Sequence, residues 1–171
     1  MQIEKLDSVC AENIFLYEYI LYFISPIKTL YPNLPKWYEE VFMPGLVRKE
    51  RSCLLASENG ELVGCVLLKK NAEEKKISTL FVRPDYRKKG IGKTLLSMAL
   101  NDLGTGASLS VSEENLSCMK PLLQEFNFSL SEVKEGFYRK GKKEYFFRQG
   151  ENRIVSKKRK KRPAERVKTQ E

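Results

Sequence analysis

Residues 80–96 read LFVRPDYRKKGIGKTLL: an apolar run, a polar loop with two glycines, and then apolar residues at helical spacing. At the start of a helix several backbone N–H groups have no partner within the helix, and the helix dipole adds partial positive charge there. Gly90 and Gly92 allow the backbone to approach a ligand closely. The segment therefore predicts an anion cradle at a helix N-terminus, and a pyrophosphate is its natural ligand.

Four basic side chains add positive charge to this loop: Arg87, Lys88, Lys89 and Lys93. The motif does not define the ligand by itself. A dinucleotide fingerprint has a third glycine where this chain has Leu95, and a nucleotide-triphosphate loop has a glycine where it has Arg87, although Gly92-Lys93-Thr94 matches the end of that loop. Nucleotide binding and a well-capped surface helix without a ligand are the two alternatives.

The segments before the loop predict helices followed by a hairpin. A helix is expected over 8–24 with Ser8 as its N-cap, and a short helix over 36–42 that ends at Pro44-Gly45. Two apolar runs, 52–57 and 62–68, flank Asn59-Gly60, which is a strong hairpin signal. A third strand is expected over 77–82.

The segments after the loop alternate between the two kinds of element. A helix is expected from Gly90 to about Leu103, a strand over 108–111, a helix over 113–126, and late strands over 129–133 and 144–148 with further β-structure between them. This order predicts an α/β (α+β) fold with a mixed central sheet flanked by helices.

The length of 171 residues fits one domain, which we expect to span residues 1–150. Residues 151–171 hold nine Lys or Arg and three Glu, a net charge of +6 out of +9 for the chain. We expect this C-terminal tail to be unpacked. The N-terminus lacks the pattern of a secretory signal, and the apolar run 14–24 is short for a bilayer span, so we expect a cytoplasmic protein without membrane contact.

Histidine is absent, which excludes Ser-His and Cys-His nucleophile pairs and histidine zinc sites. A general base must then be a carboxylate, an amine, a tyrosine or a positioned water. The four cysteines form no C-x-x-C pair, and we interpret them as reduced core thiols. No metal is expected.

Arg87-Lys-Lys-Gly90-Ile-Gly92 resembles the R/Q-x-x-G-x-G/A motif of the GNAT (GCN5-related N-acetyltransferase) superfamily, and the preceding Phe81-Val-Arg-Pro-Asp-Tyr-Arg is also typical of it. The order of elements over about residues 36–148 is similar as well. The resemblance implies acetyl-CoA as co-substrate and a cleft for it where the fourth and fifth strands of the family splay apart. An amine would attack the thioester directly there.

The resemblance also implies which residues hold acetyl-CoA. Backbone groups of Phe81 and Val82 would hold the pantetheine arm, and the loop amides from Lys88 to Gly92 would hold the pyrophosphate. The full set of cofactor-binding residues implied in this way is Phe81, Val82, Arg87, Lys88, Lys89, Gly90, Ile91, Gly92, Lys93 and Thr94.

The chain departs from the family at its usual catalytic positions. Ser78 and Thr79 stand where many members carry a glutamate base, and Leu123 stands where many carry an acidic tyrosine. Asn127 replaces a glycine and can accept the same left-handed conformation. Tyr138 is the preferred replacement acid, with Tyr145 as the other phenol, although a packing role as a half-buried strand tyrosine is the favoured interpretation of Tyr138.

Glu113 and Glu114 could hold a water as base, or complement a helix dipole. The sequence leaves three classes of acyl acceptor: a small amine, a protein amine and an aminoacyl-tRNA. The run 157–162 in the tail indicates nucleic-acid contact, a solvated terminus or a nuclear address. A catalytically weak module that binds CoA or nucleic acid is the alternative function, and the sequence leaves monomer and homodimer open.

Overall fold

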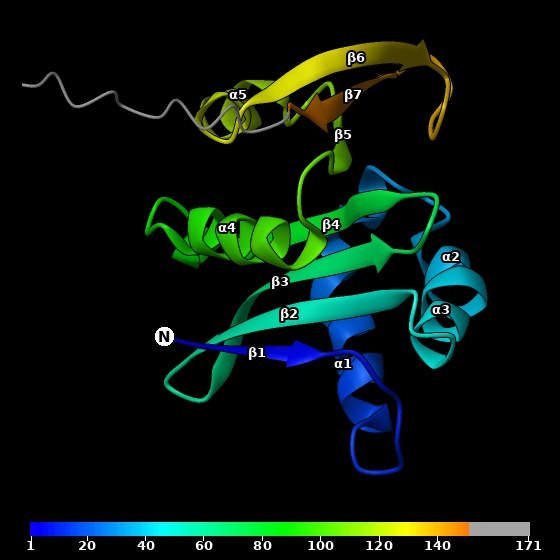
Figure 1. Cartoon of the computed structure of the whole chain (residues 1–171), viewed down its shortest axis with the longest axis vertical. Coiled ribbons are helices and arrows are strands. Elements are labelled where there is room, and N and C mark those ends of the chain that lie inside the picture. The colour runs from blue at the N-terminus through cyan, green and yellow to red at the C-terminus, as the bar shows by residue number, and fades with distance from the viewer. Residues whose placement is uncertain (151–171) are drawn as a thin grey trace, which may run out of the picture.

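The computed structural model describes residues 1–150, so the predicted basic tail, residues 151–171, lies outside the described residues. A single mixed sheet runs through these residues in the order β1-β2-β3-β4-β5-β7-β6 (Figure 1). Its strands are β1 (Gln2–Leu6), β2 (Arg51–Glu58), β3 (Glu61–Lys70), β4 (Lys75–Val82), β5 (Ser108–Ser112), β6 (Phe128–Glu135) and β7 (Lys143–Gln149). The six strands expected by range are present, and β1 is an additional one. The further β-structure expected between the two late strands is absent, because residues 136–142 form the turn that joins β6 to β7.

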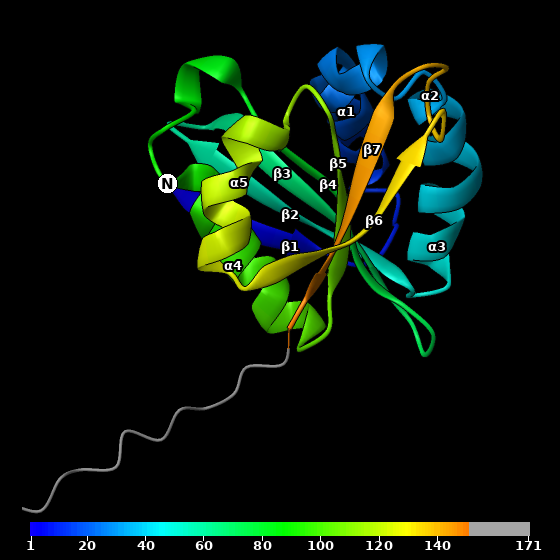
Figure 2. The ribbon, with the colours of Figure 1, turned by 90° about the horizontal axis from the view of Figure 1, so that it is seen from above.

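Helices cover both faces of the sheet (Figure 2). The first face carries α4 (Ile91–Leu103) and α5 (Leu116–Glu125), and the other carries α1 (Ile14–Ile24), α2 (Leu34–Trp37) and α3 (Met43–Val47). Each side has its own core. Leu95 and Leu96 of α4 are fully buried against β3, while Phe81 of β4 packs into the second core through an edge-to-face contact with Phe23.

The early helices differ from the sequence expectation. Residues 8–13 form a turn in which the Asn13 side chain accepts a bond from Cys10 N–H and donates one to Ser8 O, so Ser8 is not an N-cap. The second helical segment does not end at Pro44. It continues through a π-helical turn (Tyr38–Phe42) into α3, because Pro44 lies in the first turn of α3, where its missing N–H costs little.

The cysteines also divide differently from the expectation. Cys53 and Cys65 are buried free thiols, and Cys10 and Cys118 are exposed. Within residues 1–150 no helix is long and apolar enough to cross a membrane.

The sheet opens between β4 and β5. These parallel strands share one register pair, Lys76 with Ser108, at the point where both begin. The β3–β4 register shifts next to Leu67, which leaves Ser78 as the extra residue of a bulge in β4. From there to Val82, β4 pairs with no strand on its β5 side among the described residues, so the two strands splay apart as the resemblance implied (Figure 1).

Candidate active site

The loop that joins β4 to α4 has the backbone geometry of an anion-binding nest. Lys88 and Gly90 both have positive φ, 60° and 84°. Gly90 caps α4, where a β-branched side chain would be strained. Successive N–H groups in such a loop point to one side and form a concavity for an anion.

The amides of this loop are free within the described part of the chain. Thr94 N–H is the first to bond back to the loop, to Gly90 O at 3.0 Å, and no described backbone or side-chain atom accepts from the amides of residues 88–93. The space in front is open as well. A Cβ on Gly90 would meet nothing within 4 Å, and one on Gly92 would meet only Val82, at 3.7 Å.

The basic side chains of the loop have distinct roles. Arg87 Nε donates to Val82 O at 3.0 Å and fixes the loop on the end of β4. Lys89 lies over the ring of Tyr86, with Nζ 4.6 Å from its centroid, so Tyr86 shapes the loop. Lys93 pairs with Glu125 of α5. Lys88 has neither an ion pair nor an aromatic contact among the described residues, which leaves its charge available to a ligand.

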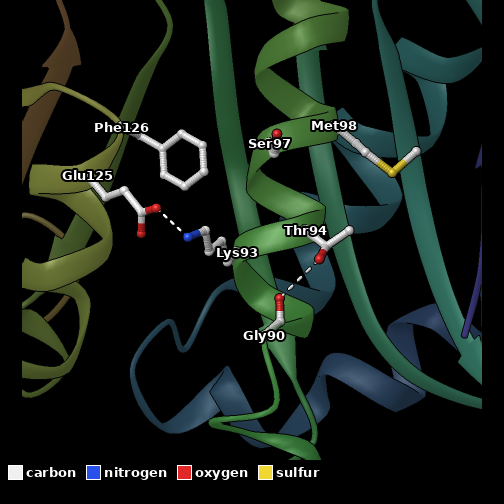
Figure 3. A pocket seen from close by; sticks show the side chains of 7 residues that line it. All are labelled: Gly90, Lys93, Thr94, Ser97, Met98, Glu125 and Phe126. Carbon is white, nitrogen blue, oxygen red and sulfur yellow. Dashed lines mark hydrogen bonds and ion pairs between the residues drawn. The ribbon is translucent and has the colours of Figure 1, made fainter.

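A hollow of about 470 Å³ adjoins the start of α4. Figure 3 shows Lys93 and Glu125 pointing toward one another across it from α4 and α5. It is lined by Gly90, Lys93, Thr94, Ser97, Met98, Glu125 and Phe126. Of the sequence-predicted set, Gly90, Lys93 and Thr94 therefore come together on one surface.

The main chain of β4 presents alternate residues to the gap. Arg83 N–H donates to Val63 O at 2.9 Å, and Phe81 lies opposite Cys65 in the same ladder. Hydrogen-bonding groups of adjacent residues point to opposite neighbours, so Leu80 and Val82 present their amide and carbonyl groups to the β5 side. The main chain of Phe81, expected to hold the pantetheine arm, pairs with β3, whereas that of Leu80, which was not in the expected set, faces the gap.

A buried carboxylate lies across the gap on β7. Glu144 is 4% exposed and accepts a hydrogen bond from Tyr31 Oη at 3.2 Å. Burial raises the pKa of Glu144, and the hydroxyls of Ser110 and Tyr31 oppose that rise. Sequence reasoning missed Glu144 because its partner lies 113 residues away. The available signal was a carboxylate directly before the aromatic run Tyr145-Phe146-Phe147 at the start of a strand.

Tyr138 lies in the β6–β7 turn, near this carboxylate. Its ring contacts that of Tyr31 edge to face, with centroids 5.1 Å apart. Burial raises the pKa of Tyr138, so the phenol keeps its proton at neutral pH. Tyr145, the other candidate phenol, belongs to the opposite face of β7, because it alternates with Glu144.

Glu113 and Glu114 form ion pairs with the β6–β7 turn. Glu113 pairs with Lys142 at 2.8 Å, and Glu114 accepts two bonds from Arg139 at 2.7 and 2.8 Å. The Arg139 guanidinium lowers the pKa of Glu114 to about 2, which makes this carboxylate a poor base. Both groups precede α5, and their main contacts are with the turn.

The other departures from the family pattern have packing roles. Leu123 is 2% exposed in the core beneath α5. Ser78 Oγ accepts a hydrogen bond from Arg51 at 3.3 Å, and Thr79 is buried. Asn127 adopts φ of 58°, so the left-handed conformation expected at this position is confirmed. No group of three acidic or thiol ligands within residues 1–150 is placed to hold a metal ion.

Comparisons with known proteins agree on one family. The family model described as "Acetyltransferase (GNAT) family" matches residues 16–120. An aminoglycoside 6'-N-acetyltransferase complexed with coenzyme A is similar in structure at 15% identity and a TM-score of 0.64, covering 87% of this chain and 96% of its own. A search of curated proteins gives no match.

Two further structures have the same fold. Arabidopsis thaliana NAA60, in complex with a bisubstrate analogue, is similar at 21% identity and a TM-score of 0.60, covering 88% of this chain and 99% of its own. An acetyltransferase assigned to the GNAT family from Desulfovibrio desulfuricans is similar at 16% identity and a TM-score of 0.63, covering 86% of this chain and 98% of its own. At these identities the likeness shows the fold.

Proposed function

The chain belongs to the GNAT acetyltransferase family, and on that premise we propose that it transfers an acetyl group from acetyl-CoA to an amine by direct attack on the thioester. Family membership makes it an acyl-CoA-dependent N-acetyltransferase. The proposal adds which residues bind acetyl-CoA and transfer the proton, that the acceptor is an amine, and that the amine attacks the thioester directly.

One observation carries the proposal: a nest of free amides at residues 88–93 opens beside a strand edge that pairs with no other strand among the described residues. The amides would hold the pyrophosphate, with Lys88 supplying charge, and the pantetheine arm would bond to Leu80 and Val82 as an added strand. The hollow beside Gly90, Lys93 and Thr94 would take the remainder of the nucleotide. Arg87 supports the loop, Lys89 packs on Tyr86, and Ile91 is buried beneath the helix start.

The thioester would then lie within reach of the β4 main chain. The amide of Val82 would donate to the carbonyl oxygen as negative charge develops on it. Tyr138 would donate a proton to the departing thiolate, because its phenol is neutral and lies on the β5–β7 side of the gap. We place the reaction in the cytoplasm, where the buried thiols of Cys53 and Cys65 would stay reduced.

Titration calorimetry with acetyl-CoA, free CoA and ATP tests the cofactor assignment. We expect acetyl-CoA and CoA to bind in the micromolar range and ATP to bind far more weakly, because only the CoA forms carry an arm for the β4 edge. Equal affinity for ATP would mean that the nest holds phosphates without using the gap, and absence of acetyl-CoA binding would remove the proposed function.

Replacing Tyr138 with Phe should lower kcat about 10- to 100-fold while the acetyl-CoA dissociation constant stays unchanged, since the hydroxyl is lost and the ring contact with Tyr31 is kept. Tyr145→Phe is the matched control, because it removes a phenol from the opposite face of β7. Steady-state kinetics and calorimetry give the two quantities. An unchanged kcat would return Tyr138 to a packing role.

A catalytically weak module that binds CoA or nucleic acid is the second candidate. It is favoured by Leu123 in place of the usual tyrosine and by the ion pairs that occupy Glu113 and Glu114. Turnover with any amine decides against it. Salt-dependent RNA binding that is lost on removing residues 151–171 would favour it.

A further inference from the structure

Glu144 is a buried carboxylate, and Lys134, its register partner on β6, directs its ammonium group to Glu132 instead. No Lys or Arg nitrogen within residues 1–150 lies within ion-pair distance of it. Tyr31 Oη donates a hydrogen bond to it. A carboxylate that loses water without gaining a cation raises the free energy of the folded protein. This cost is typical of a site that waits for a ligand.

Ser112 provides an independent second observation. It is 1% exposed, and its hydroxyl is the one buried side-chain polar atom without a hydrogen-bond partner in the described residues. Ser112 lies directly opposite Glu144 in the β5–β7 register. An unsatisfied buried hydroxyl is rare in proteins. Two adjacent buried polar groups therefore have spare hydrogen-bonding capacity at the same place.

A row of aromatic rings in mutual contact begins at Tyr31, the residue that donates to Glu144. Tyr31 contacts Tyr138, Tyr138 contacts Phe137 at 4.6 Å between centroids, and Phe137 contacts Phe146 at 5.2 Å, all edge to face. Phe146 shares a face of β7 with Glu144 because the two are separated by one residue. Lys134 Nζ already lies over the rings of Phe137 and Phe146, at 5.0 and 5.1 Å. The rings of Tyr31 and Tyr138 are therefore the ones that could attract the cation of a ligand or pack on its apolar carbon.

The cluster also has the right place in the fold. Ser112 ends β5, at the open end of the β4–β5 gap, and Glu144 pairs with it there. Tyr31 reaches the cluster from the side of α1–α3, opposite to α4 and its loop (Figure 2). A co-substrate held at the loop and an acceptor held by Glu144 would thus meet in the gap from opposite faces of the sheet.

We propose that Glu144, assisted by Tyr31 and Ser112, binds the ammonium group of the acceptor and acts as the general base of acetyl transfer. This inference rests on the proposed function. It names the acceptor class as a protonated primary amine on an apolar carbon, because the charged nitrogen meets a carboxylate and the adjacent carbon meets aromatic rings.

The proton balance follows from the geometry. Glu144 takes one proton from the ammonium, and the free amine attacks the thioester carbonyl carbon. The C–N bond forms, the C–S bond breaks, and the second surplus proton of the nitrogen ends on the CoA sulfur by way of Tyr138. Glu144 then releases its proton to solvent. The products are the amide, CoA with a free thiol, and one proton.

The base must be ionised before the amine enters, so activity rises with pH through the pKa of Glu144. Burial raises that pKa, while Tyr31, Ser110 and the more distant charges of Arg139 and Lys76 lower it. Tyr31 and Tyr138, the titratable phenols at the site, stay protonated over this range because burial raises the pKa of each. Lys134 faces Glu144 from β6 as a cation. Loss of the Tyr31 hydroxyl would destabilise the carboxylate and move the acidic limb of the pH profile to higher pH.

Glu144→Gln tests the proposal with shape and size conserved. The assay uses any amine that the wild-type protein acetylates. We expect kcat to fall about 100-fold or more and the acidic limb of the pH profile to disappear, while the affinity for acetyl-CoA stays unchanged. Glu132→Gln on the adjacent strand β6 is the matched control, because that carboxylate is exposed. Tyr31→Phe should move the acidic limb to higher pH and lower kcat at pH values below that limb, because the carboxylate loses one of its hydrogen bonds.

A binding experiment gives a result without a known acceptor. n-Butylammonium chloride is titrated into the complex with CoA, and the amide signals of Ser110 and Ser112 are followed by NMR. We expect both signals to move in the wild-type protein and in Glu132→Gln, and the binding to weaken at least about tenfold in Glu144→Gln, which removes one charge-assisted contact.

The outcomes separate the two proposals. If acetyl-CoA binds but n-butylammonium moves neither signal in the wild-type protein, or moves both equally in Glu144→Gln, the acceptor site is wrong and the proposed function stands. If acetyl-CoA does not bind, the proposed function fails first. Should Glu144→Gln fail to fold, an unshifted acidic limb in Tyr31→Phe would overturn the role of Glu144.

Discussion

Replacing Gly90 with valine is expected to weaken acetyl-CoA binding by about 2 kcal/mol or more, about 30-fold in the dissociation constant. Gly90 holds φ of 84° at the start of α4, and a β-branched residue is strained in that conformation. Relief of the strain would turn the amides of residues 88–93 away from a common centre. Titration calorimetry with acetyl-CoA measures the loss.

Gly60→Val provides the matched control. Gly60 has φ of 81°, and a Cβ there would meet nothing within 4 Å, as at Gly90, but it lies in the β2–β3 turn. Both variants should lose similar stability, while only Gly90→Val should lose affinity for acetyl-CoA. Equal affinity in the two variants would show that the loop does not hold the pyrophosphate.

Replacing Leu95 with alanine should lower the free energy of unfolding by about 3 kcal/mol, which corresponds to a Tm lower by about 6 to 12 °C. Leu95 is fully buried between α4 and β3, close to the backbone of Gly64, so the surrounding atoms have little freedom to fill the space left by the side chain. Thermal and urea unfolding measure the change.

Met98→Ala on the same helix is the control, because Met98 is 37% exposed and borders the hollow beside the loop. Its loss should change stability by about 0.5 kcal/mol or less. A similar, small loss for Leu95→Ala would mean that α4 is held to the sheet by something other than this contact. In that case the position of the loop would not depend on the core beneath it.

The sequence predicted the parts of the molecule that depend on local signals. Gly90, the apolar spacing up to Leu103 and the Asn59-Gly60 turn are signals of this kind, and α4 and the β2–β3 hairpin lie where they indicated. Strand β1 was missed because Gln2–Leu6 is mostly exposed and polar, and it pairs at the edge of the sheet with residues about fifty positions later.

Of the candidate site, the sequence predicted only the loop at residues 88–93, which a single segment of the chain forms. The nest comes from consecutive residues, so the motif indicates it directly. The assignment of Phe81 required knowing which neighbour its main chain faces, and that follows from the β3–β4 register. Glu144, Tyr31 and Ser112 come from three distant segments, and their proximity depends on the whole topology.

The narrow attachment between β4 and β5 makes the sheet mechanically discontinuous. Strands β5, β7 and β6 are hydrogen-bonded along their length. The Glu114–Arg139 and Glu113–Lys142 ion pairs also join the segment after β5 to the β6–β7 turn, so we expect these strands to behave as one rigid unit. The gap between β4 and β5 has room for one added strand. The pantetheine arm of acetyl-CoA would take that place instead of a peptide strand. Acetyl-CoA bound along that gap would stabilise the folded state, so the resistance of the protein to unfolding would rise with the concentration of its co-substrate.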